Sequence, residues 1–319
     1  MKRLGLIVII FLLIATAACG NKSADKKDGT LNIYTTMYPL EYFTERIGGK
    51  HVEVSSIIPP GADAHTYEPS TKKMVEISEG DAFVYNKMES DEFSSSVADT
   101  LKEENVPTVD AAKGVELAHM EEHEEEGAHE EGEDAHGNEE EHHEHGSQDP
   151  HIWLDPVLAQ KMAENIYNGL VKIKPDAKDD FKKNHDALIK DLKELNASFK
   201  SKVEEAPKNS FIVSHAAYGY WAERYNLEQI AISGLSPSHE PSQHQIENII
   251  QSAKKDKIQY ILFEENVNNK VAEMINKEVG AKTLTLHNLE TLTKEDIKKD
   301  RDYLSIMKEN IDTLSKALQ

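Results

Sequence analysis

The chain has 319 residues, a formal net charge of −22, 38% hydrophobic residues and a single cysteine. This length suggests about two domains, and the hydrophobic share is sufficient for a sizeable core. The acidity argues against nucleic acid as a partner, because phosphate binding needs clustered Lys and Arg, and a lone cysteine excludes an intrachain disulfide.

The first nineteen residues are predicted to be a signal peptide. Lys2 and Arg3 precede an unbroken apolar run at 4–14 and a stretch of small residues, an order typical of secretory signals, and the run is too short for a comfortable membrane span. Cys19 follows at the expected cleavage point. The segment resembles the lipobox of bacterial lipoproteins, which implies lipidation of Cys19; an uncleaved or simply secreted form is the alternative. Residues 20–30 are polar and are predicted to form a flexible tether.

Strands and helices alternate along the next eighty residues. The predicted order is a strand at 31–35, a helix at 39–47, a strand at 51–58, a helix at 71–78, a strand at 82–85, a helix at 92–104 and a strand at 106–109. This alternation indicates βαβ units and a mostly parallel sheet.

Residues 116–149 contain fifteen acids and seven histidines but no lysine or arginine, so they carry −15 of the net charge and the rest of the chain −7. The histidines are His119, His123, His129, His136, His142, His143 and His145. Few apolar side chains are present, so we expect residues 116–148 to be a disordered loop. Neutral imidazole ligates zinc, copper and nickel. We therefore expect weak auxiliary metal sites in this loop; a merely solvated spacer is the alternative.

A helix predicted at 157–173 follows the loop, and a longer one is predicted at 176–205. The apolar residues of the longer helix have the spacing of one helical face: Phe181, Leu188, Leu192, Leu195, Phe199 and Val203. At about 1.5 Å per residue this helix would be roughly 45 Å long, enough to cross a whole domain. It is therefore predicted to be a rigid connector.

The alternation restarts after Pro207. Strands are predicted at 211–214, 227–232, 258–263 and 283–286, and helices at 216–225, 242–255, 268–279 and 300–318. The predicted fold is α/β, with two lobes built on mostly parallel sheets. The N-terminal lobe would span 31–175, the connecting helix 176–206 and the C-terminal lobe 207–319. Such molecules place ligands in the cleft between lobes, at the carboxyl ends of strands.

Four short motifs each place a potential metal ligand after a strand or beside a turn. They are GADAHTYEP with His65, DPHIWLDP with His151, VSHAAYGYW with His215, and ILFEEN with Glu264 and Glu265. Three imidazoles and one carboxylate form a tetrahedral set well suited to zinc, with bonds of about 2.0–2.2 Å. Because these motifs come from both halves, the metal is predicted to lie between the lobes.

The order of these motifs resembles the zinc-binding solute-binding proteins of bacterial ABC transporters, the ZnuA/AdcA type of cluster A-I (cluster 9). The resemblance covers residues 31–319. It implies that His65, His151 and His215 bind Zn(II), and that an acid after the penultimate strand completes the site. Glu264 matches that position best, and the adjacent Glu265 is the alternative. Three histidines favour zinc, since the manganese relatives tend to use two histidines and two carboxylates.

The resemblance further implies a receptor that is lipid-anchored at the outer face of the cytoplasmic membrane. This receptor would capture zinc with high affinity and deliver it to the membrane permease of an ABC transporter. We expect a monomer without enzymatic activity. The alternatives are a receptor of the same fold for manganese or another divalent metal, and a zinc hydrolase, for which the sequence has no HExxH motif. Adhesion is a third possibility, but no partner-binding patch is evident.

The remaining chemistry-bearing residues have more ordinary interpretations. Structural roles are predicted for His51, His185, His239, His244 and His287. Asp149 or Asp155 is expected to orient His151, because a metal-bound imidazole usually donates its other N–H to a neighbouring acceptor. Trp153 is predicted to wall the metal pocket, and Tyr218, Tyr220 and Trp221 to pack in the core.

Overall fold

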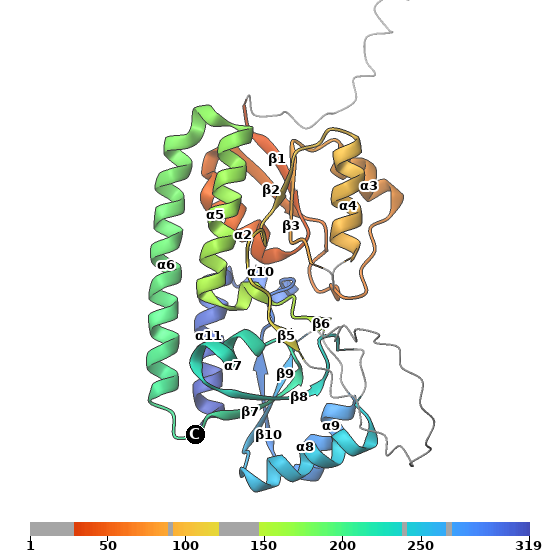
Figure 1. The fold of residues 1–319 in the computed structure, drawn as a ribbon, viewed down its shortest axis with the longest axis vertical. Helices are drawn as coiled ribbons and strands as arrows, with labels where there is room; N and C mark the ends of the chain where they lie inside the picture. The colour runs from red at the N-terminus through yellow and green to blue at the C-terminus, as the bar shows by residue number, and fades with distance from the viewer. Residues whose placement is uncertain (1–28, 89–91, 121–146, 238–240, 266–269) are drawn as a thin grey trace, which may run out of the picture. The chain divides into compact units, whose positions relative to one another are not determined.

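The computed structural model describes residues 29–88, 92–120, 147–237, 241–265 and 270–319 (Figure 1). The chain divides after Thr30, and every helix and strand below lies in the compact unit Leu31–Gln319. The predicted signal peptide with Cys19 lies outside the described residues, as do His123, His129, His136, His142, His143, His145 and His239. Within the described ranges, no helix combines the length and apolarity needed to cross a membrane.

The first four long strands form a parallel sheet, the N-terminal sheet, in the order β2-β1-β3-β4. Its elements are β1 (Leu31–Thr35), α2 (Tyr38–Gly48), the 3-10 turn η1 (Gly49–His51), β2 (Val52–Ser56), α3 (Thr71–Ser78), β3 (Ala82–Tyr85), α4 (Glu92–Glu103) and β4 (Thr108–Asp110). The strand β4 begins two residues later than predicted, after Pro107, because proline has no backbone N–H to donate.

A short antiparallel ladder, which the sequence did not indicate, joins the two ends of the histidine-rich segment. It pairs β5 (His119–Met120) with β6 (Ser147–Gln148). The backbone N–H of Asp149 also donates to the carbonyl oxygen of Ala118. The predicted loop therefore leaves and rejoins the fold at one point, two residues before His151.

Two long helices follow, α5 (Pro156–Ile173) and α6 (Lys178–Glu204), separated by the 3-10 turn η3 (Pro175–Ala177). The carboxylate of Asp155 caps α5 by accepting from the N–H groups of Val157 and Leu158, as expected for an N-cap aspartate. Helix α6 buries the predicted apolar face and packs against α5, α2 and α11, alongside the elements of both sheets (Figure 1). The predicted long helix is thus confirmed, two residues shorter at its start.

The second half forms another parallel sheet, the C-terminal sheet, in the order β10-β9-β7-β8. Its elements are β7 (Ser210–His215), α7 (Gly219–Tyr225), β8 (Glu228–Ser233), α8 (Gln243–Lys255), β9 (Tyr260–Glu264), α9 (Lys270–Val279), β10 (Lys282–Leu286), α10 (Lys294–Lys298) and α11 (Tyr303–Ala317). The five-residue helix α10 was not predicted. The α/β fold with two parallel sheets is confirmed.

A single hydrophobic cluster connects the two sheets. It includes Ile33 and Val84 of the N-terminal sheet, Leu192 of α6, and Phe211 and Leu262 of the C-terminal sheet. Because packed cores resist continuous deformation, this shared cluster holds the carboxyl ends of the strands, and the loops that follow them, in a fixed arrangement.

Candidate metal site

His65 lies in the loop between β2 and α3, after the Pro59-Pro60-Gly61 turn. The backbone N–H of His65 donates to the Oδ1 atom of Asp63 at 2.9 Å, a local bond by which Asp side chains commonly fix turns. The side chain of His65 is 19% exposed, whereas those of His151 and His215 are fully buried. It is therefore the most accessible of the three imidazoles.

His151 lies immediately before η2 (Ile152–Leu154) and is held by Asp149. The Oδ1 atom of Asp149 accepts from the backbone N–H of His151 at 2.9 Å and from its Nδ1 atom at 2.8 Å. Asp155 instead caps α5 and pairs with Arg224. Of the two aspartates considered from the sequence, Asp149 is thus the one that orients His151. The other ring nitrogen, Nε2, is buried without a hydrogen-bond partner.

His215 is the last residue of β7, an interior strand of the C-terminal sheet. Its Nδ1 atom donates to the Oε1 atom of Glu264 at 2.9 Å, and its Nε2 atom lies 2.9 Å from the carbonyl oxygen of Leu235. Binding an ion through Nε2 would require the contact with Leu235 to give way.

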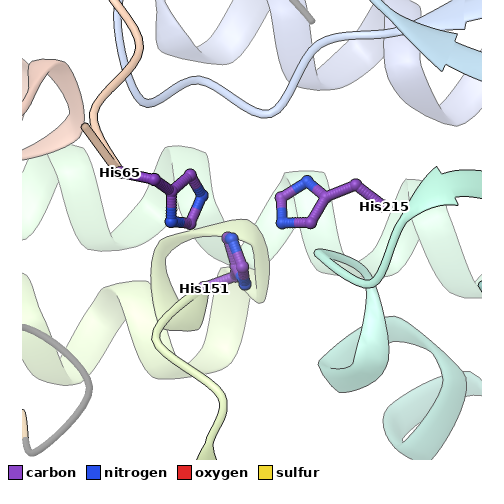
Figure 2. Close-up of side chains that lie close together, drawn as sticks. All are labelled: His65, His151 and His215. Atoms are coloured by element: carbon purple, nitrogen blue, oxygen red, sulfur yellow. The ribbon is translucent and has the colours of Figure 1, made fainter. Parts of the chain in front are cut away.

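The three histidines converge although they are far apart in sequence. One ring nitrogen of each lies within 4.8 Å of those of the other two. The ring centroids are 5.9 Å apart for His65 and His151, 5.3 Å for His65 and His215, and 4.9 Å for His151 and His215. Figure 2 shows the three rings gathered from three separate segments. This spacing suits three imidazoles around one ion.

Glu290 provides a carboxylate that the sequence analysis did not consider. It follows β10, its side chain is 8% exposed, and its Oε1 atom lies 3.0 Å from Nε2 of His65 and 3.5 Å from Nε2 of His151. Burial opposes ionisation, but the neighbouring His65 and His151 outweigh it and lower the pKa of Glu290 well below its usual range. Glu290 is therefore a carboxylate facing two imidazoles.

The charge of Glu290 acts on the histidines in return. Burial disfavours the imidazolium form of His65, but Glu290 outweighs it and raises the pKa of His65. For His151, burial is again opposed, here by the hydrogen bond to Asp149 and by the nearby carboxylate of Glu290, and the pKa of His151 is raised. A metal ion therefore competes with protons for these two imidazoles up to a higher pH than it would for an isolated imidazole.

Glu264 has a different position from Glu290. Its Oε1 atom accepts from Nδ1 of His215, and its Oε2 atom accepts from the side-chain amide of Asn288 at 3.0 Å. This is the arrangement of a carboxylate that orients a metal-binding histidine. Glu265, the alternative considered from the sequence, is exposed and belongs to another group.

That second group contains Glu265, His287 and Asp296, whose potential ligand atoms also lie within 4.8 Å of one another. However, Nδ1 of His287 accepts from the N–H of Leu289 at 2.9 Å, and its Nε2 atom donates to Asp296 at 3.1 Å. Asp296 also accepts from Thr293 and from Arg301. Because both nitrogens of His287 are engaged, this group is a structural network, in agreement with the role predicted for His287.

Aromatic side chains hold the segment of His151 in place. Trp153 lies against His151, with ring centroids 5.3 Å apart, and its Nε1 atom donates to the carbonyl oxygen of Asn288. The hydroxyl of Tyr220 donates to the carbonyl oxygen of Asp149, and Nε1 of Trp221 to that of Leu154. These contacts agree with the predicted wall and packing roles.

Four further histidines in the described ranges belong to other elements. His51 pairs with Asp180 at 2.7 Å, His185 is on α6, His244 is on α8 and His119 begins β5. Neither group of potential metal ligands found in the described ranges includes any of them.

A family model, ZnuA, described as zinc-uptake complex component A periplasmic, matches residues 33–317. The zinc-binding lipoprotein AdcA of Streptococcus pneumoniae is 39% identical over 98% of this chain and 60% of its own length. The high-affinity zinc uptake system protein ZnuA of Bacillus subtilis is 39% identical over 99% of this chain and 98% of its own length. The chain thus spans nearly all of the Bacillus relative but only 60% of the pneumococcal one.

Solved structures agree with these sequence matches. The crystal structure of Zn(II)-bound AdcA from Streptococcus pneumoniae superposes with a TM-score of 0.74 and 36% identity, covering 91% of this chain and 58% of that one. A family model that matches nearly all of Leu31–Gln319, together with a relative of nearly equal length, establishes the family. The chain belongs to the ZnuA family of zinc-uptake components.

Proposed function

We propose that this chain is an extracytoplasmic receptor that binds Zn(II) with high affinity and delivers it to the membrane permease of an ABC transporter for import. The observation that carries the proposal is the convergence of three imidazoles from distant segments beside the buried carboxylate of Glu290. The names of the relatives, which concern zinc binding and zinc uptake, point to the same cargo.

In this proposal His65, His151, His215 and Glu290 bind the ion, and Glu264 orients His215. Two contacts support this division of roles. Glu290 faces the Nε2 atoms of His65 and His151, and Nε2 of His151 has no hydrogen-bond partner. Glu264 instead accepts from Nδ1 of the third imidazole. Glu264 as the fourth ligand, expected from the sequence, is the alternative.

The ligand set also bears on the competing functions. A catalytic zinc keeps an open position for water and needs a nearby general base. With Glu290 as fourth ligand the coordination sphere is complete, and Glu264 is occupied by His215 and Asn288. This favours a binding protein over a hydrolase. Three imidazoles favour zinc over manganese, which prefers oxygen ligands.

We further propose that the chain is a monomer, anchored through lipid on Cys19 to the outer face of the cytoplasmic membrane. The signal-like segment and the lipoprotein name of the pneumococcal relative support the anchor. The histidine-rich segment, from His119 to His145, would be an auxiliary set of weak metal sites.

Calorimetric titration of the protein without its signal segment tests the central proposal. One zinc ion is expected to bind tightly, and His65→Ala, His151→Ala and His215→Ala should each lower the affinity by orders of magnitude. His185→Ala on α6 is the matched control and should bind as the parent does. Unchanged tight binding in all three ligand variants would contradict the proposal, and hydrolysis of ester or peptide substrates above background would favour the enzyme alternative.

A further inference from the structure

The three histidines of the site are not equally anchored. His215 extends from an interior strand, and the segment of His151 is tied to Asn288, Tyr220 and Trp221 by hydrogen bonds. His65, by contrast, lies in a loop that follows β2, the edge strand of the N-terminal sheet, and its side chain is the most exposed of the three. The segment of His65 is therefore the one that can most readily move away from a bound ion.

The loop between β10 and α10 reaches this segment through two consecutive residues. The carboxylate of Glu290 contacts His65, and the hydroxyl of Thr291 donates to the carbonyl oxygen of Ala62 at 3.1 Å, three residues before His65. The carbonyl oxygen of Glu290 also accepts from the backbone N–H of Tyr38 at 3.0 Å. Thr291 is 4% exposed, whereas Ala62 is half-buried, so the bond is shielded from water mainly on its donor side.

These two contacts differ in what happens to them when an ion binds. The bond between Glu290 and His65 uses atoms that would coordinate zinc, so an ion in the site replaces it. The bond between Thr291 and Ala62 uses no ligand atom, so it is available in both states. It can therefore hold the His65 loop in position before the ion arrives and while the ion is bound.

We propose that Thr291 is a positioning residue whose hydroxyl holds the His65 loop against the β10–α10 loop, and thereby slows the release of zinc. The inference rests on the proposed function. A ligand that is held in its binding geometry beforehand binds at a lower entropic cost. Losing the hydroxyl also leaves the carbonyl oxygen of Ala62 without this donor, which destabilises the observed position of the His65 loop.

The test compares Thr291→Val, which keeps the shape and removes the hydroxyl, with Thr291→Ser, which keeps the hydroxyl. Zinc release to excess chelator is followed by stopped flow in the otherwise unchanged protein. We expect about 3- to 10-fold faster release from Thr291→Val, as for one lost shielded hydrogen bond, and near-parent release from Thr291→Ser. Thr44→Val is the matched control, because Thr44 is also buried, on α2, and its hydroxyl has no hydrogen-bond partner in the described structure.

A general loss of stability is separated by a second measurement. Chemical unfolding of the metal-free Thr291→Val and Thr44→Val proteins measures their free energies of unfolding. We expect both variants to lose stability, but only Thr291→Val to release zinc faster. Zinc release from Thr291→Val at the parent rate would overturn the inference, and so would an equal acceleration of release in Thr44→Val. Either result would leave the proposed function intact, provided that the parent protein binds zinc tightly. Absence of tight zinc binding by the parent would overturn both.

Discussion

At the scale of single residues, the two carboxylates near the histidines face different ring nitrogens. Glu264 accepts from Nδ1 of His215, while Glu290 faces Nε2 of His65 and of His151. Asp149 repeats the position of Glu264 on its own histidine, since it accepts from Nδ1 of His151. Two histidines are thus oriented through Nδ1 by a carboxylate, which leaves their Nε2 atoms to bind the proposed ion.

This difference predicts distinct effects of removing each charge. Glu290→Gln should weaken zinc binding strongly and alter the visible spectrum of the Co(II)-substituted protein, because an ion ligand changes. Glu264→Gln should weaken zinc binding by about 10- to 100-fold, as for groups that orient a metal ligand. The visible spectrum of its Co(II) form should remain that of a tetrahedral site. Calorimetry and absorption spectroscopy measure both. A changed spectrum for Glu264→Gln with an unchanged one for Glu290→Gln would instead identify Glu264 as the ligand.

The sequence indicated the three histidines that converge, but it did not draw attention to Glu290, for which we propose the role of fourth ligand. Each histidine lies in a distinctive motif, whereas Glu290 stands in an ordinary polar run, HNLETLT. Its significance comes from topology, because the loop after β10 turns back toward the segments of His65 and His151. The sequence does contain a signal for Glu290. Because the carboxyl ends of parallel strands lie at one edge of a sheet, an acid after β10 is as good a ligand candidate as Glu264 or Glu265 at the end of β9.

At the scale of elements, several helices and strands begin and end where their flanking residues predict. The strands β1 and β3 and the helix α3 have the predicted bounds: Gly29 and Gly80 lie two residues before the strands, and Ser70 caps the helix. The β5–β6 ladder and α10 were missed because each is too short to produce a periodic pattern. Helix α10 is held instead by a local network, since Thr293 and Asp296 form its capping box and Asp296 also accepts from His287 and Arg301.

The network at α10 predicts a pH-dependent contribution to stability. Burial opposes ionisation of Asp296, but hydrogen bonds from Thr293 and the nearby His287 outweigh it and lower its pKa. Its ionised form thus stabilises the fold above the unfolded-state pKa of about 3.9, and this contribution is lost as the pH falls through the lower folded-state value. Asp296→Asn should lower the free energy of unfolding by about 1–3 kcal/mol at pH 7 and by progressively less below about pH 4.

Denaturant unfolding of the metal-free protein between pH 3 and pH 7 measures this effect. Glu295→Gln on the same helix is the control, because Glu295 makes only exposed ion pairs with Lys298 and Lys299, which contribute little. If the stability lost in Asp296→Asn did not vary with pH, the proposal that ionised Asp296 stabilises the fold would be contradicted.

At the scale of the whole molecule, the shared core and the α6 helix connect both sheets, so the site is held mainly by the fold itself. Within the part of the chain that the structure describes, His65, His151, His215 and Glu290 offer four potential ligands, enough for a tetrahedral site. The tight site and the histidine-rich segment should therefore function separately.

Deleting residues 121–145 tests this separation. The tight site should keep its affinity, while weaker binding events in the calorimetric titration should disappear. In the full-length protein those weak events should also fade below about pH 6, where exposed imidazole becomes protonated. A deletion that weakens the tight site as much as His151→Ala does would show that the segment contributes essential ligands.

The most direct test of the account is a crystal structure of the zinc complex with anomalous diffraction at the zinc edge. We predict one fully occupied ion, about 2.0–2.2 Å from an imidazole nitrogen of His65, His151 and His215 and from a carboxylate oxygen of Glu290. An ion bound elsewhere, with these four side chains too far apart to share it, would contradict the account.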